Sequence, residues 1–135
     1  MKKVLIVEDE EMTAGLLQQA VDHLEGFESK VIDSLQEVQA ECAANPFPYD
    51  CALFDVEIYE QAAPRAPNSK PSRDWGIEAL PILGGVLDKD RIVILTHFSG
   101  MIREKLSAMG YGERVFAKGI HSEKLEKELR RMCGV

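Results

Sequence analysis

Four short apolar runs, each ending directly before a polar or charged residue, most constrain how this chain can fold. They cover residues 4–7, 51–54, 92–95 and 115–117. Short apolar runs separated by helical patterns are typical of buried parallel strands. In a parallel α/β sheet the carboxyl ends of the strands lie on one edge, where ligands bind. The polar residues that follow the runs are therefore expected to meet at that edge.

These polar residues are three carboxylates, a hydroxyl and an ammonium: Glu8, Asp9, Asp55, Thr96 and Lys118. Clustered carboxylates resist ionising together unless a cation neutralises them. Mg²⁺ takes oxygen ligands and pairs with phosphates, so this composition suits a divalent cation and a phosphoryl group. Each residue alone could be an ordinary surface residue. Their joint placement at strand ends favours an acidic, metal-capable pocket.

The segments between the runs predict five helices and one further strand. Residues 27–32 form a polar strand, which fits a sheet edge. Five strands alternating with five helices predict an α/β fold: a doubly wound, five-stranded parallel sheet of order 2-1-3-4-5, in a flavodoxin-like three-layer sandwich. The predicted helices are residues 10–25, a helix capped by Ser34, residues 75–87 capped by Asp74, residues 99–109, and a helix capped by Ser122.

Two of these helices carry more specific signals. The first has apolar residues at helical spacing, which predicts a buried stripe. In the third, Pro81 and the glycine pair at 84–85 predict a kink or an early end. The apolar stripe of the first helix consists of Leu16, Leu17, Ala20, Val21 and Leu24.

Length and composition exclude several classes of protein. The 135 residues suit one domain with a proper core, and the formal charge of −7 argues against non-specific nucleic-acid binding. No apolar stretch approaches the ~20 residues of a membrane span, and the start lacks a signal-peptide core. The three cysteines, Cys42, Cys51 and Cys133, lack metal-ligand spacing, which predicts reduced thiols in a cytoplasmic protein. Cys51 is expected to be a small core residue.

The motifs together resemble the receiver domains of two-component response regulators. The resemblance covers nearly the whole chain and rests on Val-Glu-Asp-Glu at 7–10, Tyr-Asp-Cys-Ala-Leu-Phe-Asp at 49–55, Thr96 and Lys118. It implies a single receiver domain over residues 1–135 with no effector domain. It also implies that Asp55 accepts a phosphoryl group from a histidine kinase or phosphotransfer protein, and that no other enzymatic activity is present.

The same resemblance assigns roles around Asp55. Mg²⁺ (or Mn²⁺) would be held by the carboxylates of Asp9 and Asp55, by Glu8 through water, and by the backbone carbonyl of Glu57. Lys118 and Thr96 would bind the phosphate oxygens. Inward movement of Thr96 would reshape the face of the fourth helix, fifth strand and fifth helix, where a downstream protein or a second copy docks. Neither a nucleic acid nor a membrane is an expected partner.

The chain departs from the family in several places. Residues 61–73 are a proline-rich insertion with a local charge of +3, expected to be either a solvated loop or a cationic lid or docking arm. His97 replaces a small residue beside Thr96. Val115 stands where the family often has a switch aromatic, and Gly119 replaces the proline after Lys118. Glu57 lies at a position that influences phosphate loss in the family, so Glu57, His97 and Val115 are candidate modulators.

Other functions remain open at this stage. The departures favour a phosphorylation-independent pseudo-receiver that keeps the fold as an interaction module. An aspartate-nucleophile phosphohydrolase would use similar groups, but it places its nucleophile in an Asp-x-Asp motif after the first strand, whereas the candidate nucleophile here, Asp55, follows the third strand. An FMN-binding flavodoxin relative is disfavoured, because the acidic residues 8–11 oppose a phosphate.

Overall fold

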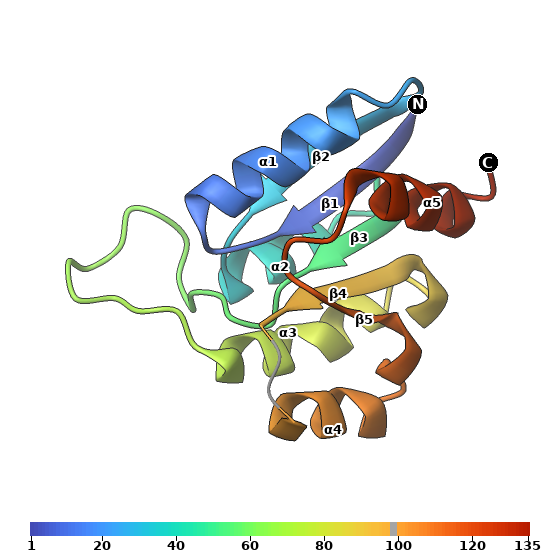
Figure 1. Ribbon diagram of the computed structural model, residues 1–135. Coiled ribbons are helices and arrows are strands. Elements are labelled where there is room, and N and C mark those ends of the chain that lie inside the picture. The colour runs from blue at the N-terminus through green and yellow to red at the C-terminus, as the bar shows by residue number, and fades with distance from the viewer. Residues whose placement is uncertain (98–99) are drawn as a thin grey trace.

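The computed structural model describes residues 1–97 and 100–135 and contains one five-stranded parallel sheet (Figure 1). The strand order is β2-β1-β3-β4-β5 and every neighbouring pair is parallel, which confirms the predicted topology. The polar strand lies at the sheet edge, as expected. The strands are β1 (Lys2–Val7), β2 (Phe27–Ile32), β3 (Cys51–Phe54), β4 (Ile92–Thr96) and β5 (Val115–Ala117).

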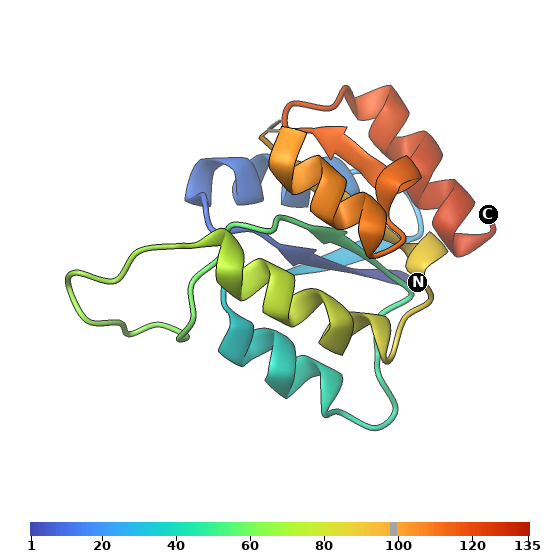
Figure 2. The ribbon, with the colours of Figure 1, turned by 90° about the horizontal axis from the view of Figure 1, so that it is seen from below.

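Helices cover both faces of the sheet in three layers (Figures 1 and 2). One core cluster joins α2, α3 and α4 to strand residues such as Leu5 and Val7, and the other joins α1 and α5 to Val4 and Ile6. This division follows from the alternation of side chains along a strand. None of the described helices is long and apolar enough to cross a membrane. The helices are α1 (Glu11–Asp22), α2 (Leu35–Cys42), α3 (Arg73–Gly84), α4 (Gly100–Ala108) and α5 (Ser122–Cys133), with short turns η1 (Lys89–Arg91) and η2 (Gly112–Arg114).

Several predicted helix details differ from the structure. The cap of α3 is Ser72 rather than Asp74, and its hydroxyl accepts the Asp74 N–H at 3.2 Å. Pro81 lies inside α3, which ends at Gly84, earlier than Leu87, as the glycine pair indicated. Ser122 is the first residue of α5, not its cap. The predicted start of the fourth helix at residue 99 lies outside the described residues.

The stripe predicted for α1 is also narrower than expected. Val21 is fully buried, and Leu17, Ala20 and Leu24 pack partly against the same core. Leu16, however, is 62% exposed. Adjacent helical residues point about 100° apart, so Leu16 and Leu17 cannot both face the sheet fully.

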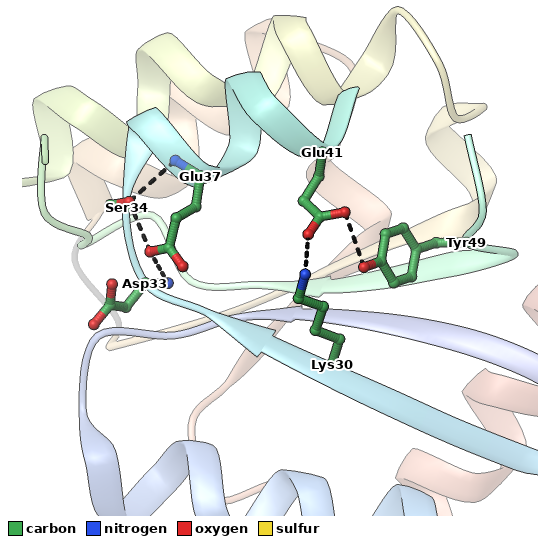
Figure 3. Close-up of polar contacts among 6 residues, drawn as sticks. All are labelled: Lys30, Asp33, Ser34, Glu37, Glu41 and Tyr49. Carbon is green, nitrogen blue, oxygen red and sulfur yellow. Dashed lines mark hydrogen bonds and ion pairs between the residues drawn. The ribbon is translucent and has the colours of Figure 1, made fainter. Parts of the chain in front are cut away.

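The start of α2 is fixed by a reciprocal set of hydrogen bonds (Figure 3). The Ser34 hydroxyl accepts the Glu37 N–H at 3.1 Å, which confirms the predicted cap. The Glu37 carboxylate in turn accepts the Ser34 hydroxyl and the N–H of Asp33, the residue before the cap, so the arrangement resembles a capping box. Farther along the helix, Glu41 binds both Lys30 and Tyr49. These contacts hold α2 against the edge strand β2.

The long connection from β3 to α3 is held by backbone hydrogen bonds where it leaves the sheet and where it returns to α3. Ile58 and Ser72 exchange backbone hydrogen bonds of 3.3 and 2.9 Å, so the residues between them form a closed loop. On the other side, the Tyr59 N–H donates to the Asp33 carbonyl at 3.0 Å and the Leu35 N–H donates to the Tyr59 carbonyl at 2.8 Å. Figures 1 and 2 show the loop extending beyond the carboxyl ends of the strands.

Candidate acidic site at the carboxyl edge of the sheet

Backbone hydrogen bonds that continue the sheet place three of the predicted site residues. The Glu8 N–H donates to the Ile32 carbonyl at 2.9 Å, and the Asp55 N–H donates to the Val7 carbonyl at 2.7 Å. The Lys118 N–H donates to the Thr96 carbonyl at 3.2 Å. Each of these residues directly follows its strand. Their side chains therefore start from a rigid edge rather than from a loop.

The structure brings the predicted carboxylates together around one ammonium. Carboxylate oxygens of Glu8, Asp9 and Asp55 lie within 4.8 Å of one another. The Nζ of Lys118 lies 2.8 Å from Glu8 Oε1 and 2.9 Å from Asp55 Oδ2. Glu8 and Asp55 are each 2% exposed. When all three carboxyl groups are ionised, one ammonium leaves the cluster with an excess negative charge, which suits a cation.

Burial and mutual repulsion raise the pKa values of the carboxyl groups. Burial, together with hydrogen bonding and charge from Asp55, raises the pKa of Asp9 to about 7. Burial and the neighbouring Glu8 raise the pKa of Asp55 to about 6, and burial also raises the pKa of Glu8. For Lys118, burial lowers the pKa, but hydrogen bonds to Glu8 and Asp55 outweigh it and the pKa is raised. Lys118 therefore stays an ammonium.

The residues present fit a hard divalent cation. Asp9 Oδ1 is buried and has no hydrogen-bond partner among the described residues, so it can serve as a ligand without breaking a contact. The candidate ligands are all oxygens, which is the donor set that Mg²⁺ prefers. The Glu57 N–H donates to Asp55 Oδ1 at 3.1 Å and orients that carboxylate. The role of the Glu57 carbonyl as a ligand stays a prediction.

Thr96 and His97 differ in their surroundings. Thr96 is 3% exposed, and its hydroxyl donates a long hydrogen bond of 3.4 Å to the His97 carbonyl. His97 is exposed and lines a separate hollow of about 440 Å³ together with Lys118 and Gly119, beside α1 and α5. His97 is therefore placed next to the site residue Lys118, on the side of the sheet covered by α1 and α5.

The structure at Val115 and Gly119 agrees with the departures read from the sequence. Val115 is buried in the core shared with α3 and α4, while Phe116 packs on the opposite face, because side chains alternate along a strand. No aromatic ring therefore stands at the position of Val115. Gly119 has φ +88°, which proline cannot adopt. The turn after Lys118 is built on a glycine conformation instead.

Gly76 lies in close contact with the backbone next to Asp55. A Cβ at Gly76 would lie 1.7 Å from the backbone oxygen of Val56, the residue after Asp55. The third helix thus packs directly on the backbone that carries Asp55. Only glycine permits this approach.

Sequence reasoning missed an anchor inside the insertion. The Arg65 guanidinium lies 2.5 Å from Asp33 Oδ2 and stacks 3.8 Å over the Tyr59 ring. The Arg65 side chain is only 14% exposed, and the Ala62 N–H donates to the Gln36 side chain at 2.8 Å. The local charge of +3 was the only sequence signal, because Asp33 and Tyr59 lie in other segments.

This anchor lies beside the acidic site. Arg65, Asp33 and Tyr59 line a cavity of about 470 Å³ that Glu8 and Asp9 also line. Arg65 forms its ion pair with Asp33, the residue after β2. The positive charge of Arg65 is therefore paired with Asp33 rather than with Asp55. The base of the insertion is a wall of this cavity.

Comparison with solved structures identifies the fold. A receiver protein from Sinorhizobium medicae matches with a TM-score of 0.71 at 12% identity, over 99% of this chain and 95% of that one. A receiver domain from Clostridium thermocellum matches with 0.71 at 17% identity, over 99% and 95%. A CheY-like receiver domain from Methanospirillum hungatei matches with 0.73 at 17% identity, over 99% and 94%. No family model and no curated protein sequence matches. The chain has the fold of a response-regulator receiver domain over nearly its whole length.

Proposed function

We propose that the chain is a phosphoacceptor receiver of a two-component phosphorelay. Asp55 would take a phosphoryl group from a histidine kinase or phosphotransfer protein, and the chain would signal by docking to another protein. One observation carries this proposal: Asp55 is buried at the sheet edge with Oδ2 2.9 Å from Lys118 and with Glu8 and Asp9 around it. The receiver fold supports it.

The proposed transfer uses Asp55 as the nucleophile. A carboxylate oxygen attacks the phosphorus of a phosphohistidine; the P–O bond forms, the P–N bond breaks, and the imidazole nitrogen keeps the electron pair. With a pKa of about 6, Asp55 is mostly ionised at neutral pH and can attack. A phosphoryl group on Oδ2 would lie next to the Lys118 ammonium, which offsets its charge.

The acidic neighbours supply a cation site for the same reaction. Glu8 and Asp9, together with Asp55, would hold Mg²⁺, with the Glu57 carbonyl as a further ligand. When bound, Mg²⁺ neutralises the oxygens of the transferring group. Glu57 N–H holds Asp55 Oδ1 at 3.1 Å, which fixes the carboxylate plane for attack.

The output would pass through Thr96 to the face formed by α4, β5 and α5. Thr96 is buried at the end of β4, and its hydroxyl makes only the 3.4 Å bond to the His97 carbonyl among the described residues. That hydroxyl is free to reorient toward a phosphate. A protein target, or a second copy of the chain, is the proposed partner at this face.

A pseudo-receiver is the second candidate, and specific observations favour it. Val115 and the turn at Gly119 remove two elements through which the family couples phosphorylation to its outer face. In this alternative the same face binds a partner without any phosphoryl transfer.

Intact mass spectrometry after incubation with acetyl phosphate separates the two candidates. The receiver is expected to gain a single phosphoryl group that requires Mg²⁺ and is lost in Asp55→Asn. If acetyl phosphate gives no addition, cognate phosphodonors remain to be tested, with Mg²⁺ binding measured by calorimetry in parallel. Absence of both phosphorylation and Mg²⁺ binding in the folded chain would establish the pseudo-receiver.

A further inference from the structure

Two buried cysteines lie in contact at the opposite end of the sheet from the acidic site. Cys51 is the first residue of β3 and Cys133 is the last residue of α5. Their Sγ atoms are 3.5 Å apart, although the residues are 82 positions apart in the sequence. The residues are 0% and 6% exposed. Because Asp55 follows the other end of β3, this pair is separate from the phosphoacceptor site.

The environment makes the two thiols unequal. The hydrogen bond shared with Cys51 lowers the pKa of Cys133, while burial opposes this change. The same hydrogen bond, together with burial, raises the pKa of Cys51. The positive charges of Lys2 and Arg91 also favour the Cys133 thiolate, and Asp50 opposes it. Cys133 is also the less buried of the two residues and ends α5, so it is the better placed nucleophile, and Cys51 is the protonated thiol beside it.

We propose that Cys51 and Cys133 form a redox-modification site, which a hydroperoxide converts into an intramolecular disulfide. The Cys133 thiolate attacks a peroxide oxygen; the O–O bond breaks and a sulfenic acid forms, with hydroxide leaving. The Cys51 sulfur then attacks the sulfenic sulfur; the S–S bond forms, the S–O bond breaks, and the thiol proton leaves with the oxygen as water. Two thiols and one hydrogen peroxide give one disulfide and two waters.

The geometry requires only a small movement. A disulfide places its sulfur atoms about 2.0 Å apart, so the sulfurs must approach from 3.5 Å. Cys133 ends α5 and is followed by Gly134 at φ +69°, a left-handed helix end. Last turns of helices fray more than their interiors, and we expect such opening at the end of α5 to admit a small peroxide to the Cys133 sulfur.

The third cysteine provides an internal control. Cys42 is half-buried at the end of α2 and has no sulfur contact among the described residues. Burial, with the neighbouring Glu41, raises the pKa of Cys42 to about 11, so little thiolate is present at neutral pH. Cys42 is expected to stay a free thiol under the conditions that join the other two.

The disulfide would tie the end of α5 to the start of β3. A cross-link between residues so far apart restricts the unfolded chain, so the oxidised protein should unfold at a higher temperature. The disulfide would also restrain α5, which is part of the proposed docking face of α4, β5 and α5. Its formation does not depend on phosphorylation of Asp55.

The test uses the full chain, reduced, and then treated with hydrogen peroxide. After removal of the peroxide, the protein is denatured and alkylated, and its intact mass and disulfide-linked peptides are measured. We expect one alkyl group, on Cys42, loss of two hydrogens, and a Cys51–Cys133 peptide, with a higher thermal midpoint that dithiothreitol reverses. Cys42→Ser should form the same Cys51–Cys133 disulfide and take up no alkyl group. Cys133→Ser should form no disulfide between Cys51 and position 133.

Several results would overturn the proposal, and all are readable in the unmutated chain. They are three alkylated thiols after treatment, a sulfinic or sulfonic acid on Cys133, a disulfide that includes Cys42, or a disulfide only between two chains. Because these readouts do not need a variant, misfolding of Cys51→Ser or Cys133→Ser does not affect the decision.

Discussion

The Nζ of Lys118 lies 2.9 Å from Asp55 Oδ2 and 2.8 Å from Glu8 Oε1. The side chains of the two acidic residues are 1% and 2% exposed, and that of Lys118 is 11% exposed. One ammonium therefore serves two buried carboxylates that arrive from different strands. This relationship decides both the stability of the sheet edge and the chemistry available to Asp55.

Replacing Lys118 tests its part in stability. Lys118→Met leaves two buried carboxylates without their cation and should lower the free energy of unfolding by about 2 kcal/mol near pH 8. The loss should be smaller near about pH 5, because the carboxyls then take up protons. Urea unfolding at both pH values measures this. Lys3→Met is the control, since Lys3 is 50% exposed and 3.8 Å from Glu28. An equal loss at both pH values would contradict the account.

The raised pKa of Asp9 predicts a pH dependence without Mg²⁺. Its pKa is raised from 3.8 to about 7 in the folded chain, so the stabilisation it gives is complete below the unfolded value and is lost as the pH rises through about 7. Asp9→Asn removes this loss. The variant should melt about 3 °C higher than the original chain near pH 8, and the difference should shrink toward pH 4.

Mg²⁺ should reverse the order of the two melting temperatures, so that the original chain melts above Asp9→Asn. Excess Mg²⁺ stabilises the chain that binds it, so the original sequence should gain melting temperature and Asp9→Asn should not. Glu60→Gln, an exposed carboxylate in the β3–α3 connection, removes the same charge and should respond to Mg²⁺ like the original. If Asp9→Asn were stabilised by Mg²⁺ as much as the original chain, Asp9 would be excluded as a ligand.

The contact between Gly76 and Val56 predicts a large effect of one methyl group. In Gly76→Ala the new Cβ would lie 1.7 Å from the Val56 oxygen, and this overpacking should cost about 2 kcal/mol or more. Because Val56 follows Asp55, the phosphorylation rate should fall as well. Gly15→Ala is the matched control: its Cβ meets nothing within 4 Å, and alanine should stabilise α1 by about 0.5–1 kcal/mol. Thermal unfolding of both variants measures the difference.

The anchor at Arg65 predicts local order in the insertion. Arg65→Gln removes the ion pair with Asp33 and the stacking on Tyr59. Amide exchange at Ala62 and proteolysis within the insertion should become faster, while global stability changes by less than about 1 kcal/mol. Lys70→Gln, at an exposed position of the same insertion, should leave both rates unchanged. Equal rates in the two variants would show that Arg65 does not hold the loop.

The sequence predicted the parts of the fold that depend on local patterns. The apolar runs fixed the strands, and the polar residues after them met at one edge, since strand ends in a parallel sheet must do so. The cap of α2 was also predictable, because it is local: the Ser34 hydroxyl accepts the N–H of Glu37, three positions later, and donates to the Glu37 carboxylate.

Contacts between distant segments could not be predicted in this way. Ser72 rather than Asp74 caps α3 because Ser72 also exchanges backbone hydrogen bonds with Ile58, at the other end of the loop. The Arg65–Asp33 pair and the contact between Cys51 and Cys133 likewise join segments that share no sequence pattern. Such contacts become visible only when the sheet order and the helix placement are known.

The most direct test of the central claim is to locate the phosphoryl group in the acetyl phosphate-treated chain. Borohydride reduction of an acyl phosphate converts the modified aspartate to homoserine, which peptide mass spectrometry can assign to one position. The account predicts conversion at Asp55, dependent on Mg²⁺, with the other carboxylates of the site unchanged. Conversion at Asp9 or elsewhere, or an equal signal in Asp55→Asn, would contradict it.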